Sequence, residues 1–125
     1  MMQQFKIEYV FKNISTSILW NLISSTQGLE KWYAESCREE NGKFVFEWGN
    51  SEEVAQLLKK KEGEYIRFHR DDSEKNTFFE FQINTNPLTK DVTLTIIDFA
   101  EEDEIEDAEM LWNKQIEELR KSSGI

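Results

Sequence analysis

Two side chains in this sequence have the chemistry of a general acid, a general base or a nucleophile: the single histidine, His69, and the single cysteine, Cys37. A histidine inside a cavity could exchange protons near neutral pH. Strand alternation predicts instead that His69 shares the solvent face with Arg67, while Ile66 and Phe68 face the core. The residues around Cys37 supply neither a base nor a basic environment, which predicts an unreactive, half-buried thiol.

Motifs for metals, phosphates and nucleotides are missing from the sequence. One His and one Cys are too few for a zinc site, which needs several converging ligands. The phosphate-binding loops Gly-x-Gly-x-x-Gly and Gly-x-x-x-x-Gly-Lys do not occur. The basic run Lys59-Lys60-Lys61 is followed at once by Glu62 and Glu64, which is typical of a solvated strand end. We therefore expect no cofactor and no metal, and a binding protein rather than an enzyme.

The charge balance restricts the partners. The 125 residues include 15 Lys and Arg against 25 Asp and Glu, which gives a net charge of −10. Such an acidic chain is a poor ligand for nucleic acid or for anionic membrane surfaces. It also lacks the run of about 20 apolar residues that a membrane-spanning helix requires. With one cysteine and no signal-like N-terminus, we expect a cytoplasmic location and no membrane insertion.

The negative charge is concentrated near the C-terminal end. Eight acidic residues occur there without an intervening Lys or Arg: Asp98, Glu101, Glu102, Asp103, Glu104, Glu106, Asp107 and Glu109. Acidic side chains at a helix N-terminus are stabilised by the helix dipole. We interpret this stretch as the solvated start of a helix rather than as a docking site.

The apolar periodicity predicts mostly strands. Alternating residues from Phe5 to Phe11 indicate a first strand, and Ser15 to Ser17 can cap a short helix after it. A second short helix is expected from about Thr26 to Trp32. Turn signals such as Asn41-Gly42 then divide the chain into further predicted strands at residues 35–40, 43–48, 64–70, 77–83 and 92–99.

Two segments need separate treatment. Residues 51–61 have strong helix propensity but lie among hairpins, where Val54, Gln56 and Leu58 could share one face of a strand. Residues from about Asp103 to Lys121 carry apolar side chains at three- and four-residue intervals, which predicts one long amphipathic helix. Without βαβ alternation, the sheet should be antiparallel, with this helix covering one face.

Three sequence segments together resemble the START-like (SRPBCC) superfamily. They are Ile18-Leu19-Trp20, then Gly28-Leu29-Glu30-Lys31-Trp32-Tyr33, and then Phe44-Val45-Phe46-Glu47-Trp48-Gly49. The last two match a Gly-Leu-x-x-Trp turn and a Phe-x-Trp-Gly strand of the small bacterial proteins related to activators of heat-shock chaperone ATPases. The segment Leu94 to Glu101, followed by an acidic helix start and Leu111-Trp112, adds to the resemblance.

The resemblance covers nearly the whole chain and implies one START-like domain over residues 1–125. It implies an α+β helix-grip fold, in which a curved antiparallel sheet of about six to seven strands wraps a long C-terminal helix. Two short helices follow the first strand in this fold. The resemblance also decides residues 51–61 in favour of a strand, and it implies an apolar cavity between the sheet and the helix.

Aromatic residues are the feature with the most functional potential. A concave sheet with a helix above it could enclose an apolar ligand, and the candidate lining residues are Phe46, Trp48, Phe68, Phe79, Phe81, Trp112 and Ile116. The alternative is that these side chains only fill the core, because a chain this small must bury most of its large apolar residues. The sequence leaves both readings open.

Three functions follow as hypotheses. The first is a non-enzymatic domain that binds a small hydrophobic molecule, such as a lipid. The second is a protein-interaction module similar to chaperone ATPase activators, in which the acidic surface and exposed aromatics such as Trp20 or Tyr33 contact a protein partner or a second copy. The third is a cyclase-like enzyme that uses His69 or a cavity carboxylate.

Overall fold

The computed structural model describes residues 1–124 and contains one seven-stranded sheet in the order β1-β7-β6-β5-β4-β3-β2. All neighbouring strands are antiparallel. Strands β2 to β7 form a meander, and β1 returns to pair with β7. The strands are β1 (Met2–Phe11), β2 (Ser36–Glu40), β3 (Lys43–Trp48), β4 (Ser51–Lys61), β5 (Tyr65–Arg70), β6 (Phe79–Thr85) and β7 (Val92–Glu101).

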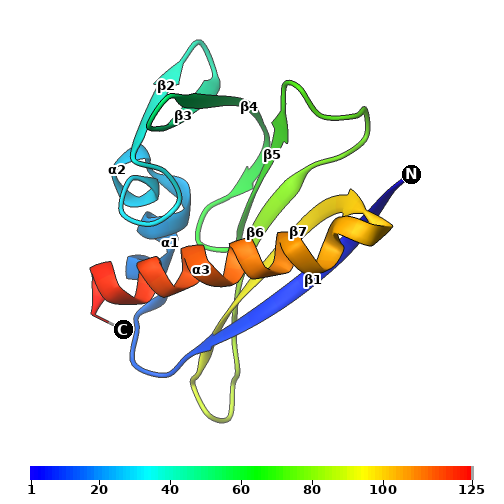
Figure 1. Cartoon of the computed structure of the whole chain (residues 1–125). Coiled ribbons are helices and arrows are strands. Elements are labelled where there is room, and N and C mark those ends of the chain that lie inside the picture. The colour runs from blue at the N-terminus through cyan, green and yellow to red at the C-terminus, as the bar shows by residue number, and fades with distance from the viewer. Residues whose placement is uncertain (125) are drawn as a thin grey trace.

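The helices lie on one side of this sheet. Helices α1 (Thr16–Ser24) and α2 (Thr26–Leu29) follow β1, and a 3-10 turn (Glu102–Glu104) leads from β7 into the long α3 (Ile105–Ser123). In Figure 1, α3 crosses the sheet and its C-terminal end lies beside α1. This arrangement confirms the predicted antiparallel helix-grip architecture.

Residues 51–61 form the strand β4 despite their helix propensity, as predicted. Pairing with β3 and β5 on both sides supplies hydrogen bonds that outweigh the local preference. Ala55 and Leu57 face the core, whereas Leu58 is exposed. The second helix is shorter than expected: α2 ends at Leu29, and residues 30–33 continue as turns.

Serine side chains begin both short helices. Ser15 Oγ accepts a hydrogen bond from the backbone N–H of Ile18, and Ser25 Oγ accepts one from Gly28. Gly28 lies against the backbone of α1: a Cβ at this position would be 2.0 Å from the carbonyl oxygen of Asn21. Only glycine therefore allows α2 to pack this closely on α1.

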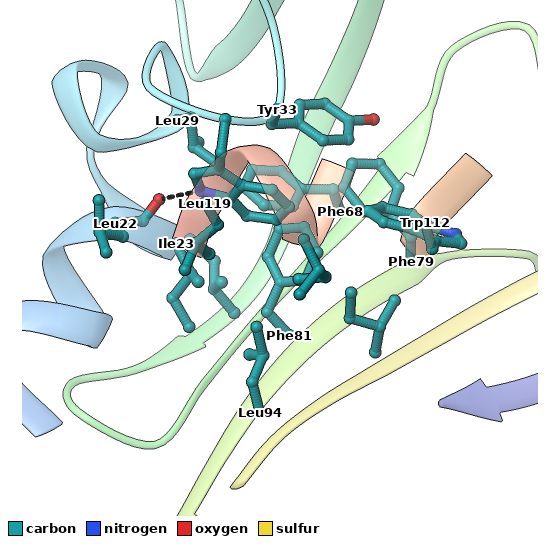
Figure 2. Close-up of a cluster of buried hydrophobic side chains, with 14 of the residues drawn as sticks. Leu22, Ile23, Leu29, Tyr33, Phe68, Phe79, Phe81, Leu94, Trp112 and Leu119 are labelled. Carbon is teal, nitrogen blue, oxygen red and sulfur yellow. Dashed lines mark hydrogen bonds between the residues drawn. The ribbon is translucent and has the colours of Figure 1, made fainter. Parts of the chain in front are cut away.

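Aromatic rings fill the space between α3 and the sheet, as Figure 2 shows for Tyr33, Phe68, Phe79, Phe81 and Trp112. Neighbouring rings pack in edge-on, tilted or stacked pairs. The stacked rings of Phe68 and Phe79, for example, have centroids 5.1 Å apart.

Trp20 and Tyr33 are buried, with 8% and 3% of their surfaces exposed, so the expectation that they are exposed aromatics is wrong. Trp20 packs in the core, and its Nε1–H donates to Glu62 at 2.9 Å. The Tyr33 ring contacts Phe46 and stacks on Trp112. The apolar bodies of both side chains are thus part of the core, and their polar atoms find partners at its border.

Within residues 1–124, no helix combines the length and the apolar character needed to cross a membrane.

Candidate ligand-binding site

A pocket of about 410 Å³ opens between α3 and the end of the sheet formed by Trp48, Glu53, Arg70 and Asp98. Its walls combine aromatic and aliphatic side chains with a few polar groups, which is typical of small-molecule sites. The lining residues are Tyr33, Trp48, Ser51, Glu53, Arg70, Asp98, Ala108, Leu111, Trp112 and Gln115.

Three charged side chains from three strands meet at this pocket. Arg70 donates from Nε to Glu53 Oε2 at 3.0 Å and from Nη1 to Asp98 Oδ1 at 3.0 Å. Its Nη2 also lies 3.4 Å from Asp98 Oδ2, and its guanidinium lies over the ring of Phe79, 4.3 Å from the ring centre. The cation is therefore fixed by two carboxylates and by an aromatic face.

Strand alternation explains why these charges point inward. Arg70 follows Ile66 and Phe68 on the core-facing side of β5, and Asp98 follows Leu94 and Ile96 on that of β7. The side chains of Ile66, Phe68, Leu94 and Ile96 are fully buried. A charged residue that continues an inward-facing series was the available sequence signal for this cluster.

Two aromatic residues extend the charge cluster toward the helix. The hydroxyl of Tyr33 donates to Glu53 Oε1 at 2.7 Å, and the indole Nε1–H of Trp112 donates to Asp98 Oδ2 at 3.0 Å. Burial raises the pKa of Tyr33 well above its ordinary value, and the negative charge of Glu53 raises it further against the opposing effect of Arg70. Tyr33 is therefore a neutral hydrogen-bond donor at physiological pH.

Burial alone would lower the pKa of Arg70, but its anionic partners, among them Asp98 and Glu53, more than offset this effect and raise it. Asp98 is itself 5% exposed and accepts a further hydrogen bond from the backbone N–H of Phe99. Asp98 thus belongs to the interior cluster, which corrects its assignment to the solvated acidic stretch. Glu102, Asp103, Glu104, Glu106 and Asp107 are exposed, as predicted for a solvated helix start.

The carbonyl oxygen of Tyr33 joins the pocket wall to α3. It accepts hydrogen bonds from Trp48 Nε1 at 2.8 Å and from Gln115 Nε2 at 3.0 Å. A second depression of about 400 Å³ lies on the other side of this junction and shares Tyr33, Trp48, Leu111 and Gln115 with the first. These four residues therefore separate two adjoining hollows.

The structure places two of the seven predicted lining residues at the pocket and the other five in the core. Trp48 and Trp112 line the pocket. The other five, Phe46, Phe68, Phe79, Phe81 and Ile116, are buried in the core with at most 2% of their surface exposed. Their packing fits the core-filling alternative, and a ligand role for them stays a prediction. Tyr33, Glu53, Arg70 and Asp98 were not among the predicted site residues.

His69 and Cys37 lie outside the pocket. His69 is on the face opposite Ile66 and Phe68, as predicted, and its Nδ1 lies 2.7 Å from the carbonyl oxygen of Thr77. Cys37 is buried rather than half-buried, and burial with nearby Glu30 and Glu39 raises its thiol pKa to about 12. Among the described residues, no group of three His, Cys, Asp or Glu side chains is arranged to hold a metal ion.

Comparison with known proteins identifies the family of this architecture. The family model described as the START-like superfamily domain matches residues 1–125. No curated protein matches the chain. The solution NMR structure of a Bacteroides fragilis protein is 34% identical in sequence, with a TM-score of 0.69, over 99% of this chain and 93% of that one.

More distant sequences have similar folds. The Aha1 protein from Colwellia psychrerythraea, whose structure is that of a dimer, is 12% identical with a TM-score of 0.79, over 96% of this chain and 95% of that chain. The XoxI protein from Bacillus cereus is also 12% identical, with a TM-score of 0.78, over 95% of this chain and 94% of that one. At this level of identity the similarity concerns the fold alone.

Proposed function

This chain belongs to the START-like superfamily, and on that premise we propose that it is a non-enzymatic domain that binds a small hydrophobic ligand between its sheet and α3. The binding site is the pocket that Tyr33, Trp48 and Trp112 share with the Glu53–Arg70–Asp98 cluster. Apolar burial against the rings would supply most of the affinity. The polar cluster would orient one end of the ligand.

The observation that carries this proposal is the mixture of surfaces in one pocket. Trp48 and Leu111 offer apolar surface beside the buried Trp112, and Leu111 is 60% exposed although it is a large aliphatic residue. Charged groups with only 22% of their side-chain surface exposed, Glu53 and Arg70, lie beside these residues. A pocket of about 410 Å³ matches the size range of small-molecule sites.

The hydrogen bonding of the cluster supports binding rather than catalysis. Arg70 donates to Glu53 and Asp98, and Tyr33 donates to Glu53, so charge-assisted hydrogen bonds already hold these side chains in fixed positions. His69, which the enzyme hypothesis invoked, does not line the pocket and contacts the backbone at Thr77. The cytoplasmic location expected from the sequence stays a prediction.

The test is to fill the pocket. Ala108 lines it on α3, so Ala108→Phe should occlude it, and Met110→Phe places the same ring on the same helix outside it. Native mass spectrometry of the protein purified from its own cells should reveal a bound small molecule in the wild type and in Met110→Phe. We expect Ala108→Phe to lose that molecule.

Titration with a library of apolar fragments provides the second readout, because the indole signals of Trp48 and Trp112 report directly on the pocket. Fragments should shift these signals in the wild type with dissociation constants near the millimolar range, which corresponds to about −4 kcal/mol. If no co-purified molecule is found and no fragment shifts either indole, the proposed function is wrong.

Two neighbouring apolar side chains on α3 favour a second function, a protein-interaction module. Met110 and Leu111 are 55% and 60% exposed and adjoin each other, and a contiguous exposed apolar patch can mark a site of contact with another protein. A second copy of this chain is the simplest partner to test. Sedimentation velocity should then show a dimer that Met110→Glu dissociates, whereas a monomer at all concentrations would exclude self-association through this surface.

A further inference from the structure

The charges of the side chains that line the pocket do not sum to zero. Among the residues that line it, Glu53 and Asp98 carry negative charge and Arg70 carries positive charge, which leaves one net negative charge. The two neighbouring hollows are acidic as well: one is lined by Glu101, Glu104 and Asp107, of which only Glu101 is paired with a cation, the ammonium group of Met1. The other has three Glu and two Lys among its lining residues. A ligand approaching the pocket therefore meets a negative potential.

The two carboxylates differ in their capacity for further hydrogen bonds. Each oxygen of Asp98 already faces two donors, which come from Arg70, Trp112 and the backbone of Phe99. Each oxygen of Glu53 accepts only one bond, from Tyr33 or from Arg70. Because a carboxylate oxygen can accept two, Glu53 keeps one acceptor position on each oxygen. It is the negative group that is able to receive a new donor.

Aromatic side chains line the pocket beside Glu53. Tyr33, whose hydroxyl is bound to Glu53, lies with its ring centre 5.4 Å from that of Trp48 and 5.7 Å from that of Trp112. Tyr33 and Trp112 stack on each other and are only 3% and 4% exposed, so the half-buried Trp48 offers the accessible aromatic face for an organic cation, and Leu111 offers apolar surface for the rest of the ligand. The amide of Gln115 uses its N–H on the carbonyl of Tyr33, so its oxygen is available as a further acceptor.

We infer that this pocket selects small amphipathic molecules that carry a protonated amine, with the ammonium group directed at Glu53 and the apolar part against Trp48, Trp112 and Leu111. This inference rests on the proposed ligand-binding function and specifies its ligand class. An anionic ligand would have to use the two N–H groups of Arg70 that remain free of Glu53 and Asp98, against the net negative charge of the pocket.

Three probes that share one phenyl ring and differ in charge test the inference: 2-phenylethylamine, 2-phenylethanol and 3-phenylpropionate. Binding at pH 7 is measured from the NMR shifts of the Trp48 and Trp112 indole signals. We expect the amine to bind at least tenfold more tightly than the alcohol, and the carboxylate to bind more weakly than both. Tenfold corresponds to about 1.4 kcal/mol, a modest value for a charge-assisted hydrogen bond.

Glu53→Gln should abolish the advantage of the amine over the alcohol, while Glu52→Gln, an exposed neighbour on β4, should preserve it. Because Glu53→Gln also alters the bond to Arg70, a second variant leaves the cluster intact. Ser51→Lys adds a positive charge to the pocket lining, and Asn50→Lys adds the same charge just outside it. Only Ser51→Lys should weaken the amine and strengthen the carboxylate.

The outcomes separate the two proposals. If the alcohol binds as well as the amine, or the carboxylate binds best, the inference of a cationic ligand is overturned while the ligand-binding function stands. If none of the three probes shifts either indole signal and no co-purified molecule is found, the ligand-binding function fails and the inference fails with it.

Discussion

Arg70 and Asp98 form a partly buried ion pair across an intervening strand. Arg70 lies at the end of β5 and Asp98 in β7, and the guanidinium reaches over Phe79 of β6 to place Nη1 3.0 Å from Asp98 Oδ1. Because Trp112 of α3 donates to the same carboxylate, this pair also joins the helix to the sheet. Polar contacts thus link α3 to the sheet at the pocket, in addition to the aromatic packing of the core.

Removing one member of this ion pair should destabilise the protein. Asp98→Ala leaves Arg70 with Glu53 alone and leaves the indole N–H of Trp112 without a partner. We expect the free energy of unfolding, measured by urea denaturation, to fall by about 3 kcal/mol. The exposed Asp103→Ala should change it by less than about 0.5 kcal/mol.

The double variant Arg70→Met with Asp98→Leu separates the effect of an unpaired charge from the effect of altered packing. An apolar replacement of both partners avoids an unpaired buried charge, so it should be more stable than Asp98→Ala. A double variant that is as unstable as the sum of the single variants would contradict this account.

Gly28 should tolerate no side chain. A Cβ at this position would lie 2.0 Å from the backbone oxygen of Asn21 and 2.6 Å from the Cα of Leu22, so α1 and α2 would have to separate. We expect Gly28→Ala to reduce the free energy of unfolding by more than about 2 kcal/mol. Gly63→Ala, at a turn with φ of +77° and open space around it, should cost only about 1 kcal/mol. Equal losses would argue against close helix packing as the cause.

The fold was largely predictable because its signals are local. The alternation of Phe44, Phe46 and Trp48, the Asn41-Gly42 turn and the spacing of Trp112 and Ile116 each indicate one element. Residues 51–61 show the limit of local signals, since their strand conformation depends on pairing with β3 and β5. There the family resemblance, and not propensity, gave the correct prediction.

The candidate site was much less predictable because it is assembled from distant residues. Glu53, Arg70 and Asp98 are unremarkable charged residues in sequence, and only the sheet order brings them together. Tyr33 follows a short helix whose exact end decides whether its ring enters the core, and the sequence had suggested an exposed ring. The predicted aromatics Phe68, Phe79 and Phe81 form the core beneath the cluster instead.

Cys37 should make the protein less stable at alkaline pH. Burial raises its pKa from 9.0 to about 12 in the folded protein, so the folded state keeps the thiol protonated while the unfolded chain loses the proton above pH 9. The stabilising contribution is complete below pH 9 and is lost as the pH rises toward 12. At pH 10 the expected loss is about 1.4 kcal/mol.

Cys37→Ser isolates this effect, because serine is similar in shape and does not titrate in this range. Urea denaturation at pH 8 and pH 10 should show a smaller drop in stability for Cys37→Ser than for the wild type. Tyrosines of the unfolded chain also begin to titrate near pH 10, so the difference between the two proteins is the quantity to compare. Identical pH profiles would mean that the thiol is accessible to water.

The acidic start of α3 should stabilise the helix rather than bind a partner. Glu106 and Asp107 lie in the first turn, whereas Arg120 and Lys121 lie in the last, which is the charge arrangement that the helix dipole favours. Replacing Glu106 and Asp107 with Gln and Asn should lower the free energy of unfolding by roughly 1 kcal/mol at low salt. The loss should shrink at 1 M salt, where the Debye length is about 3 Å.

The same exchange at Glu117 and Glu118, in the second half of the helix, should not destabilise the protein, because negative charge there opposes the dipole. If both pairs of substitutions have the same effect, the helix dipole does not explain the acidic stretch.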